Sequence, residues 1–240
     1  MYLKSPYPDV PPQPNVNAHH FFFNQPGQAD WPNFPVHIDL ETGEEIMNDE
    51  FLERIRDLAT GLGASVDQGG LGIRAEDKEM IGIMGENSSV SHKSFFLNKY
   101  VKFGFNLKEY ITLVHASIRL ATPFAPISSY STPFELKHAL NLTKVTRLFV
   151  DEKFLTTVVP IATELGINPN HIYLLKGSFN GRKSFWSIIK DVRKKKILRV
   201  DVRTASKNTL AYLVFSSGTS GLPKGSEFIP CPVPVQLTLY

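Results

Sequence analysis

The sequence predicts an α/β protein with a largely parallel sheet flanked by helices. Short apolar segments rich in strand-forming residues alternate with amphipathic helical segments between residues 80 and 175, as is typical of a parallel sheet covered by helices. A further apolar run, residues 211–215, leads directly into a loop of small hydroxyl residues and glycines. With 240 residues, of which 42% are hydrophobic, the chain can bury a substantial core.

The first elements are expected between residues 36 and 84. A short strand at 36–43 ends in a Thr-Gly turn, and a helix then begins with Asn48 or Asp49 as its cap and ends at Gly61. Residues 80–84 form an apolar strand. For the helix we expect a buried face of Phe51, Leu52, Ile55 and Leu58 and a solvent face of Glu53, Arg54, Arg56 and Asp57.

The alternation continues after residue 108. A helix from Glu109 precedes a strand at 122–127, and Thr132 with Glu135 forms a capping box for the next helix, which has proline at its first position. The later elements are a strand at 145–150, a helix from Asp151 to Gly166 that Pro160 interrupts, and a strand at 171–175.

Charge gives little information about partners. Lys and Arg number 26 and Asp and Glu number 23, a formal net charge of +3, which provides no argument for nucleic-acid binding. Residues 178–203 are polar and contain the basic run 193–196, for which we expect a solvated loop, with contact to an anion or a membrane surface as the alternative.

The loop after residue 215 has the chemistry of a phosphate-binding site. Its serines and threonine supply hydroxyl donors, its glycines allow close approach of backbone N–H groups, and Lys224 supplies a compact positive charge. It is not a Walker A loop, because Leu222 and Pro223 separate Gly221 from Lys224. The alternative for a Ser/Gly-rich segment of this kind is a flexible hairpin loop.

The contiguous run 212–225 resembles the signature loop of the adenylate-forming (AMP-binding) superfamily, which includes acyl-CoA synthetases, 4-coumarate–CoA ligases, luciferases and peptide-synthetase adenylation domains. Ser220 stands where many members carry Thr. The opening run 5–11 resembles the start of 4-coumarate–CoA ligase-like enzymes. In the family the loop closes over the β- and γ-phosphates of ATP, and this role is carried over to Ser216, Ser217, Gly218, Thr219, Ser220, Gly221 and Lys224.

The resemblance also suggests a division of the chain. Residues 1–35 form an extended, proline-rich arm, residues 36–225 form an incomplete N-terminal large domain of an adenylate-forming enzyme, and residues 226–240 form a proline-rich tail outside the family pattern. The apolar residues within 90–108 follow neither the helical nor the strand period. We interpret this segment as an insertion, such as retained intron sequence. His19 and His20 lack further ligands at metal-site spacing, so we expect a docked loop and no metal ligands.

The resemblance implies carboxylate activation. A carboxylate would attack the α-phosphorus of ATP, assisted by Mg²⁺, and CoA would then capture the acyl or aryl adenylate as a thioester. In the family the acyl pocket, the adenosine-binding strands and the C-terminal lysine domain lie beyond the residues matched here, so no catalytic residue and no particular acid is predicted. The alternatives are a catalytically inactive fragment or partner-binding module, and an unrelated protein with a variant P-loop, which would need a helix after the loop.

Cysteine content and hydropathy bear on the compartment. Cys231 is the only cysteine, so an internal disulfide is excluded. Neither a signal peptide near Met1 nor a membrane-spanning run of about 18 apolar residues is present. We therefore expect a soluble, intracellular protein, either cytoplasmic or peroxisomal.

Overall fold

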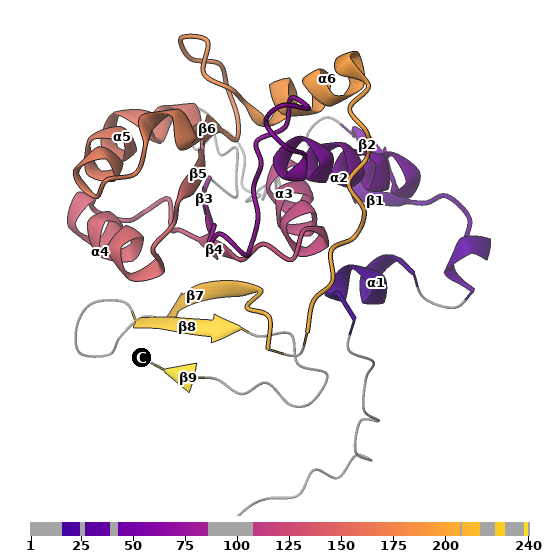
Figure 1. The fold of residues 1–240 in the computed structure, drawn as a ribbon, viewed down its shortest axis with the longest axis horizontal. Coiled ribbons are helices and arrows are strands. Elements are labelled where there is room, and N and C mark those ends of the chain that lie inside the picture. The colour runs from indigo at the N-terminus through magenta and orange to yellow at the C-terminus, as the bar shows by residue number, and fades with distance from the viewer. Residues whose placement is uncertain are drawn as a thin grey trace, which may run out of the picture.

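The computed structural model describes residues 16–24, 27–38, 43–85, 108–206, 208–216, 224–228 and 238–239. Its centre is a seven-stranded sheet with the strand order β6-β5-β3-β4-β7-β8-β9 (Figure 1). The first five strands in this order are parallel, and β8 and β9 are antiparallel to their neighbours. The strands are β3 Ile81–Met84, β4 Phe124–Pro126, β5 Arg147–Val150, β6 Ile172–Leu174, β7 Tyr212–Ser216, β8 Lys224–Phe228 and β9 Thr238–Leu239.

Helices cover both faces of the parallel part, and this confirms the predicted α/β class. One face packs against α2 (Asn48–Gly63), α3 (Lys108–Arg119) and α6 (Phe185–Lys195), and the other packs against α4 (Pro133–Thr143) and α5 (Leu155–Glu164) (Figure 1). Successive strand residues serve opposite faces: Phe149 belongs to the first core, while Leu148 and Val150 belong to the second.

The N-terminal part of the described chain is not uniformly extended, contrary to the prediction. It contains the helix α1 (Ala18–Phe23) and the 3₁₀ turn η1 (Gln28–Asp30) before the antiparallel pair β1 (Pro35–Ile38) and β2 (Glu45–Met47). Helix α1 can form because residues 15–25 contain no proline and because Asn17 caps it, its Oδ1 accepting from the amide of His19 at 2.8 Å. The expected docked loop at His19 and His20 is therefore a docked helix.

Helix α2 differs from its prediction at both ends and on its outer face. Its N-cap residue is Met47, which makes no side-chain cap bond, and it continues beyond Gly61 to Gly63. Arg54 and Asp57, which were expected in solvent, are buried. The reason is α6: the guanidinium of Arg193 donates from Nε to Asp57 Oδ2 at 2.6 Å.

Helix α6 itself corrects the expectation of a solvated loop at 178–203. Ser184 and Ser187 form its capping box, and its basic residues stand in the last turn, where cations interact favourably with the helix dipole. Its buried residues, spaced as on one helical face, are Phe185, Ile188, Ile189 and Val192.

The predicted capping box of α4 is confirmed. Thr132 Oγ1 accepts from the Glu135 amide at 3.3 Å, and Glu135 Oε2 accepts from the Thr132 amide at 2.8 Å. Asp151 precedes the 3₁₀ turn η2 (Glu152–Phe154) and makes no side-chain cap bond there, and α5 then runs through Pro160 without a break. The remaining short helix is η3 (Pro169–His171).

Two of the proposed segments, the insertion and the C-terminal tail, include some of the described residues. Of the proposed insertion 90–108, only Lys108 is described, and it begins α3. Residues 226–228 complete β8, so the sheet continues into the proposed tail. No helix in the described ranges is both long and apolar enough to cross a membrane.

We predict that Gly61→Ala destabilises the chain although alanine favours helix. A Cβ at this position would lie 2.3 Å from Ile188 Cγ2, because α2 and α6 touch there backbone to side chain. Overpacking of this kind costs about 1–3 kcal/mol, which exceeds the gain in helix propensity of about 1 kcal/mol. Denaturant-induced unfolding measures the difference.

Ile188→Ala provides the matched partner variant. On its own, Ile188→Ala should also lower the free energy of unfolding, because it leaves a cavity. The double variant should lose less stability than the sum of the two single losses. A Gly61→Ala protein as stable as the parent would contradict the tight α2–α6 contact.

Candidate functional site

The predicted phosphate loop starts at the carboxyl edge of the parallel sheet. Strand β7 pairs in parallel with β4 through Tyr212 and Phe124, so Ser216 ends at the same edge as Met84, Pro126 and Val150. In open α/β sheets, ligands bind in the crevice outside the carboxyl ends of the strands. The position of the loop therefore suits a ligand site.

The structure places the two ends of the loop next to each other. Ser216 is the last residue of β7 and Lys224 is the first of β8, and the two residues are paired in the antiparallel register. For both of them only the backbone is described, and Ser217, Gly218, Thr219, Ser220 and Gly221 lie outside the described residues. The loop is thus the connection of a β-hairpin, which either phosphate binding or a simple hairpin loop would allow.

The strand that follows the loop argues against a variant P-loop. A P-loop holds phosphate at the N-terminus of the helix that comes directly after it. Here the residues after the loop form β8, so the arrangement lacks the helix on which that mode of binding depends.

Strand β7 is anchored on both faces of the sheet. The Tyr212 ring stacks on Phe124 with a centroid distance of 5.4 Å and an interplanar angle of 26°. Tyr212 packs against the core under α2 and α3, and Leu213 packs against the core under α4 and α5. Next to it, β8 lies close to α4, because a Cβ at Gly225 would be 3.0 Å from Leu142 Cδ2. The base of the hairpin is therefore held in place.

Two acidic residues at the same edge were not recognised in the sequence as edge residues. Asp151 follows β5 and is buried, and a Cβ at Gly85, after β3, would lie 3.3 Å from its Oδ1. Glu152 braces the turn after β6, where its Oε2 accepts from the Ser178 amide at 3.0 Å. The Glu152 carboxylate thus stabilises this turn, and we assign neither Asp151 nor Glu152 a catalytic role.

The described residues contain no cluster of metal-binding side chains. Within the described ranges, no three His, Cys, Asp or Glu side chains gather closely enough to hold a metal ion.

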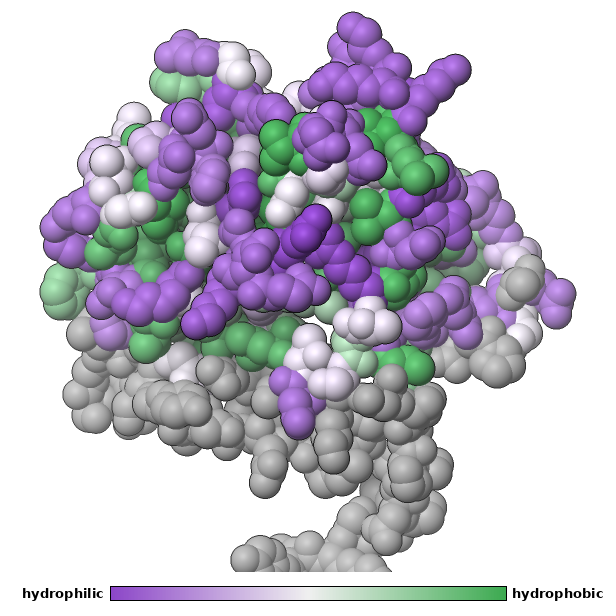
Figure 2. Space-filling model, viewed as in Figure 1, coloured by the Kyte–Doolittle hydropathy of each residue, from purple (hydrophilic) through white to green (hydrophobic). Residues whose placement is uncertain are grey.

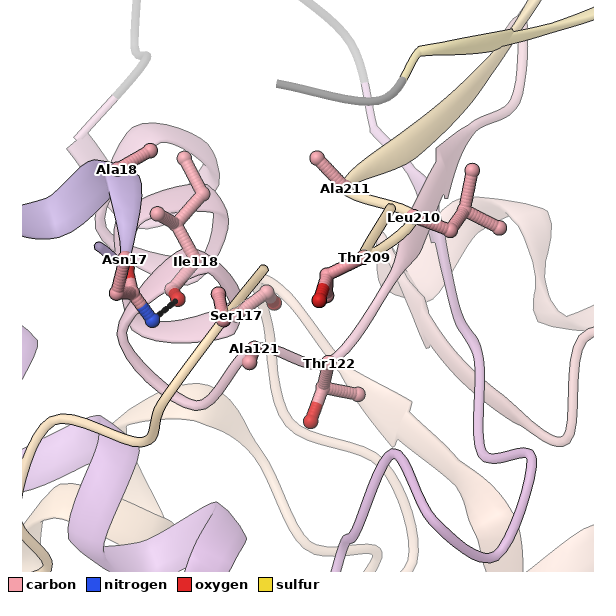
Figure 3. Close-up of a pocket in the computed structure, with 10 residues that line it drawn as sticks. Asn17, Ala18, Ser117, Ile118, Ala121, Thr122, Thr209, Leu210 and Ala211 are labelled. Carbon is pink, nitrogen blue, oxygen red and sulfur yellow. Dashed lines mark hydrogen bonds between the residues drawn. The ribbon is translucent and has the colours of Figure 1, made fainter. Parts of the chain in front are cut away.

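Two hollows lie away from the loop. A cavity of about 20 Å³ between α1, the end of α3 and residues 209–211 has room for a single water molecule (Figure 3). A larger hollow of about 860 Å³, with Arg74, Glu76, Asp77 and Arg203 among its lining residues, lies at the amino ends of β3, β4 and β7. In the space-filling view, hydrophilic side chains dominate the surface between the two helical layers, above the region of β7 and β8 (Figure 2). Since the loop leaves from the opposite edge, neither hollow belongs to the candidate phosphate site.

Comparison with protein-family models matches residues 102–227, more than half of the chain, to the AMP-binding enzyme family. The chain belongs to the AMP-binding enzyme family. The match includes the whole β7–β8 hairpin except for Phe228. Comparison with curated protein sequences gives no match.

Solved structures similar to this family member share its fold. A red-emitting luciferase from Phrixothrix hirtus matches with a TM-score of 0.64 and 17% identity over 89% of this chain and 36% of its own. The anthranilate CoA ligase AuaEII, solved with anthranoyl-AMP, matches with a TM-score of 0.66 and 19% identity over 90% of this chain and 35% of its own.

A third match is the A-PCP didomain of the carboxylic acid reductase from Segniliparus rugosus, solved with AMP. Its TM-score is 0.59, with 17% identity over 84% of this chain and 30% of its own. The chain thus spans about a third of the length of these structures, and identities this low establish the fold of the N-terminal domain of adenylate-forming enzymes and no more.

We predict that Phe124→Leu loosens β7 while the core remains folded. The substitution keeps most of the apolar volume and removes the ring stacked on Tyr212, an interaction worth about 0.5–1.5 kcal/mol. Amide hydrogen exchange of residues 212–216 should accelerate about 2- to 10-fold. Phe134→Leu, at an exposed position on α4, serves as the control and should leave this exchange unchanged. Equal exchange in the Phe124 variant and the parent would contradict the anchoring role.

Proposed function

We propose that the chain binds ATP through the loop from Ser216 to Lys224 as part of ATP-dependent carboxylate activation. The observation that carries the proposal is the β7–β8 hairpin, which begins the family's signature loop at the carboxyl edge of the sheet and pairs Ser216 with Lys224. Membership of the AMP-binding enzyme family supports the nucleotide.

The loop would act mainly on the leaving group. A carboxylate oxygen attacks the α-phosphorus, a new P–O bond forms, and the bond from the α-phosphorus to the bridging oxygen of pyrophosphate breaks. Negative charge increases on pyrophosphate as it leaves. Lys224, the hydroxyl groups of the loop and its backbone N–H groups would neutralise that charge and hold the phosphates in line.

Capture of the adenylate by CoA is the second step we propose. The thiolate sulfur attacks the acyl carbonyl carbon, a C–S bond forms, and AMP leaves with the electrons of the C–O bond. The structurally similar AuaEII is a CoA ligase for an aryl acid, anthranilate, and this makes aryl carboxylic acids the first class to test here. The narrower assignment to the 4-coumarate–CoA ligase-like group rests on residues 5–11, which lie outside the described ranges.

We predict that Lys224→Ala weakens ATP binding about 10- to 100-fold, the range for loss of a hydrogen bond to a charged group. Titration calorimetry with ATP measures this in the purified chain. Lys137→Ala is the matched control, because Lys137 is an exposed lysine on α4 that pairs with Glu164. Unchanged ATP affinity in Lys224→Ala would contradict the proposed role of the loop.

Pyrophosphate exchange with a panel of aryl and acyl acids tests the chemistry separately from binding. Exchange that depends on one acid, and that is reduced in Lys224→Ala, is the expected result. ATP binding without exchange would leave the other hypothesis from the sequence, a catalytically inactive fragment or partner-binding module that retains the nucleotide loop.

A further inference from the structure

Helix α1 is attached to the segment that leads into β7. Asn17, 3% exposed, donates from Nδ2 to the carbonyl of Ile118 at 2.8 Å (Figure 3). The same Nδ2 donates to the carbonyl of Arg203 at 2.9 Å, and Oδ1 accepts from the His19 amide at 2.8 Å. A single buried amide therefore joins α1, the end of α3 and the segment around Arg203.

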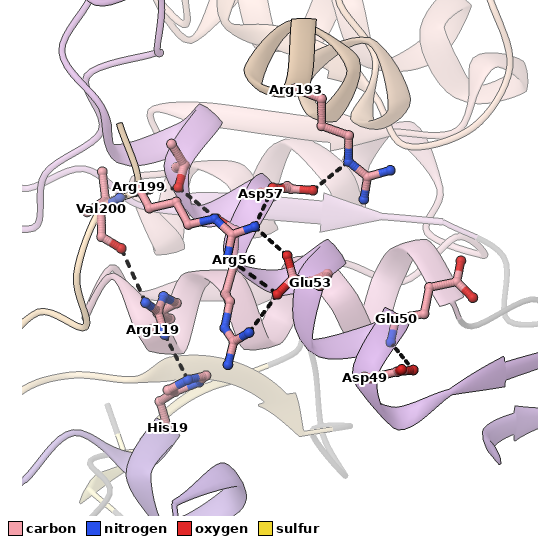
Figure 4. Close-up of polar contacts among 11 residues, drawn as sticks. His19, Asp49, Glu50, Glu53, Arg56, Asp57, Arg119, Arg193, Arg199 and Val200 are labelled. Atoms are coloured by element: carbon pink, nitrogen blue, oxygen red, sulfur yellow. Dashed lines mark hydrogen bonds and ion pairs between the residues drawn. The ribbon is translucent and has the colours of Figure 1, made fainter. Parts of the chain in front are cut away.

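Arg119 makes a second connection between the same three elements. Its Nη1 lies 3.0 Å from His19 Nε2, and its Nη2 donates to the Val200 carbonyl at 3.3 Å (Figure 4). Its own carbonyl accepts from the Arg203 amide at 3.0 Å. A guanidinium can only donate, so His19 Nε2 must accept. This contact exists only while the His19 imidazole is neutral, since protonation turns the acceptor into a donor that faces a cation.

A second histidine is covered by the same helix. His115, one turn before Arg119 on α3, packs edge-on against Phe22 and Phe23 of α1, with centroid distances of 5.3 and 5.0 Å. Phe51 of α2 closes the cluster at 5.7 Å from His115. Release of α1 would expose both His19 and one side of His115 to water.

A third histidine lies at the edge of the cluster. His37 of β1 packs on Phe51 at 5.2 Å. In the described part of the chain, one ring nitrogen of each histidine is buried without a hydrogen-bond partner: Nδ1 of His19, Nδ1 of His115 and Nε2 of His37. In His19 that nitrogen carries the proton of the neutral ring, because Nε2 accepts from Arg119, so an added proton would go to Nε2 and face the guanidinium.

The charged groups that lower the pKa values of His19 and His37 include arginines: Arg119 on α3 acts on His19, Arg56 on α2 also acts on His19, and Arg54 on α2 acts on His37. Arg54 and Arg56 are themselves paired with Glu50 and Glu53, and Asp201 acts on Arg119. His20 on α1 is a further titratable neighbour of His19. Burial, followed by the charge of Arg119, lowers the pKa of His19 from 6.5 to about 3. Burial, with a smaller effect of His37, lowers the pKa of His115 from 6.5 to about 4.

We propose that α1 is a proton-sensitive clasp that closes over α3 and the segment around Arg203 and is released by acid. With His19 and His115 neutral, α1 is docked and Asn17 binds the Arg203 carbonyl. With protons bound, α1 detaches and that bond is lost, whereas the bonds of Val200 and Arg203 to Arg119 and Thr60 stay in place.

The direction and size of the effect follow from linkage. A histidine whose pKa is lowered by docking stabilises the docked state fully above its free pKa of 6.5 and loses that contribution as the pH falls toward the docked value. Between pH 7.5 and pH 5.5 each such histidine reduces the docking equilibrium about 10-fold. His19 contributes such a factor, and His115, which release exposes on one side, contributes up to the same, so the two together should reduce it about 10- to 100-fold.

Hydrogen exchange at pH 7.5 and pH 5.5, corrected for the intrinsic exchange rates, tests the clasp. Protection of residues 17–23 should fall by about 10- to 100-fold at pH 5.5, and that of β3 and β5 should not change. This readout requires no nucleotide, so it can fail or succeed independently of ATP binding. Equal protection of 17–23 at both pH values would overturn the proposal.

The double variant His19→Gln/His115→Phe should remove the pH dependence, because glutamine can still accept from Arg119 and neither new residue titrates. His171→Gln, a half-buried histidine outside the cluster, should retain the full dependence. Should the double variant fail to fold, Asn17→Ala supplies the test: it should raise exchange of 17–23 at pH 7.5 to about the level of the acid-treated parent. A full pH response in the double variant, or unchanged exchange in Asn17→Ala, would refute the clasp.

Discussion

The requirement that a parallel sheet bury both of its faces governs this structure. The strands β3, β5 and β6 send alternate side chains to two separate cores, so each strand is apolar along most of its length. Two helices on one face are not enough to cover the sheet, and α6 completes the layer by packing Phe185, Ile188 and Ile189 against it. The close approach of α6 to Gly61 and the burial of Asp57 follow from that third helix.

This requirement explains which elements could be predicted from the sequence. The strands and the capping box of Thr132 are local signals, and they are confirmed within a few residues. Helix α6 carried the same kind of signal, with apolar residues at three- and four-residue spacing after Ser184, but the basic run at its end suggested a solvated loop. The burial of Arg54 and Asp57 could not be predicted locally, because it depends on a helix more than a hundred residues away in the chain.

The candidate site shows the same division between local and distant information. The order of residues from Ser216 to Lys224 indicates the family, and the matched family model agrees. A hairpin loop was the alternative expectation for this segment, but neither motif nor periodicity indicated that residues 224–228 form a strand, because that depends on β8 joining the sheet. The attachment of α1 to the Arg203 carbonyl could not be predicted either, since the carbonyls that Asn17 binds lie about a hundred or more positions away.

The pairing of β7 has a mechanical consequence. Its register with β8 extends from Tyr212↔Phe228 to Ser216↔Lys224, whereas its described register with β4 consists of Phe124↔Tyr212 alone. The hairpin is therefore more strongly joined by backbone pairing within itself than to β4, and side-chain contacts supply the rest of its attachment. These are the stack of Tyr212 on Phe124, the packing of Leu213 under α4 and α5, and the contact of Gly225 with Leu142. Residues outside the loop thus fix the strand ends from which the loop leaves.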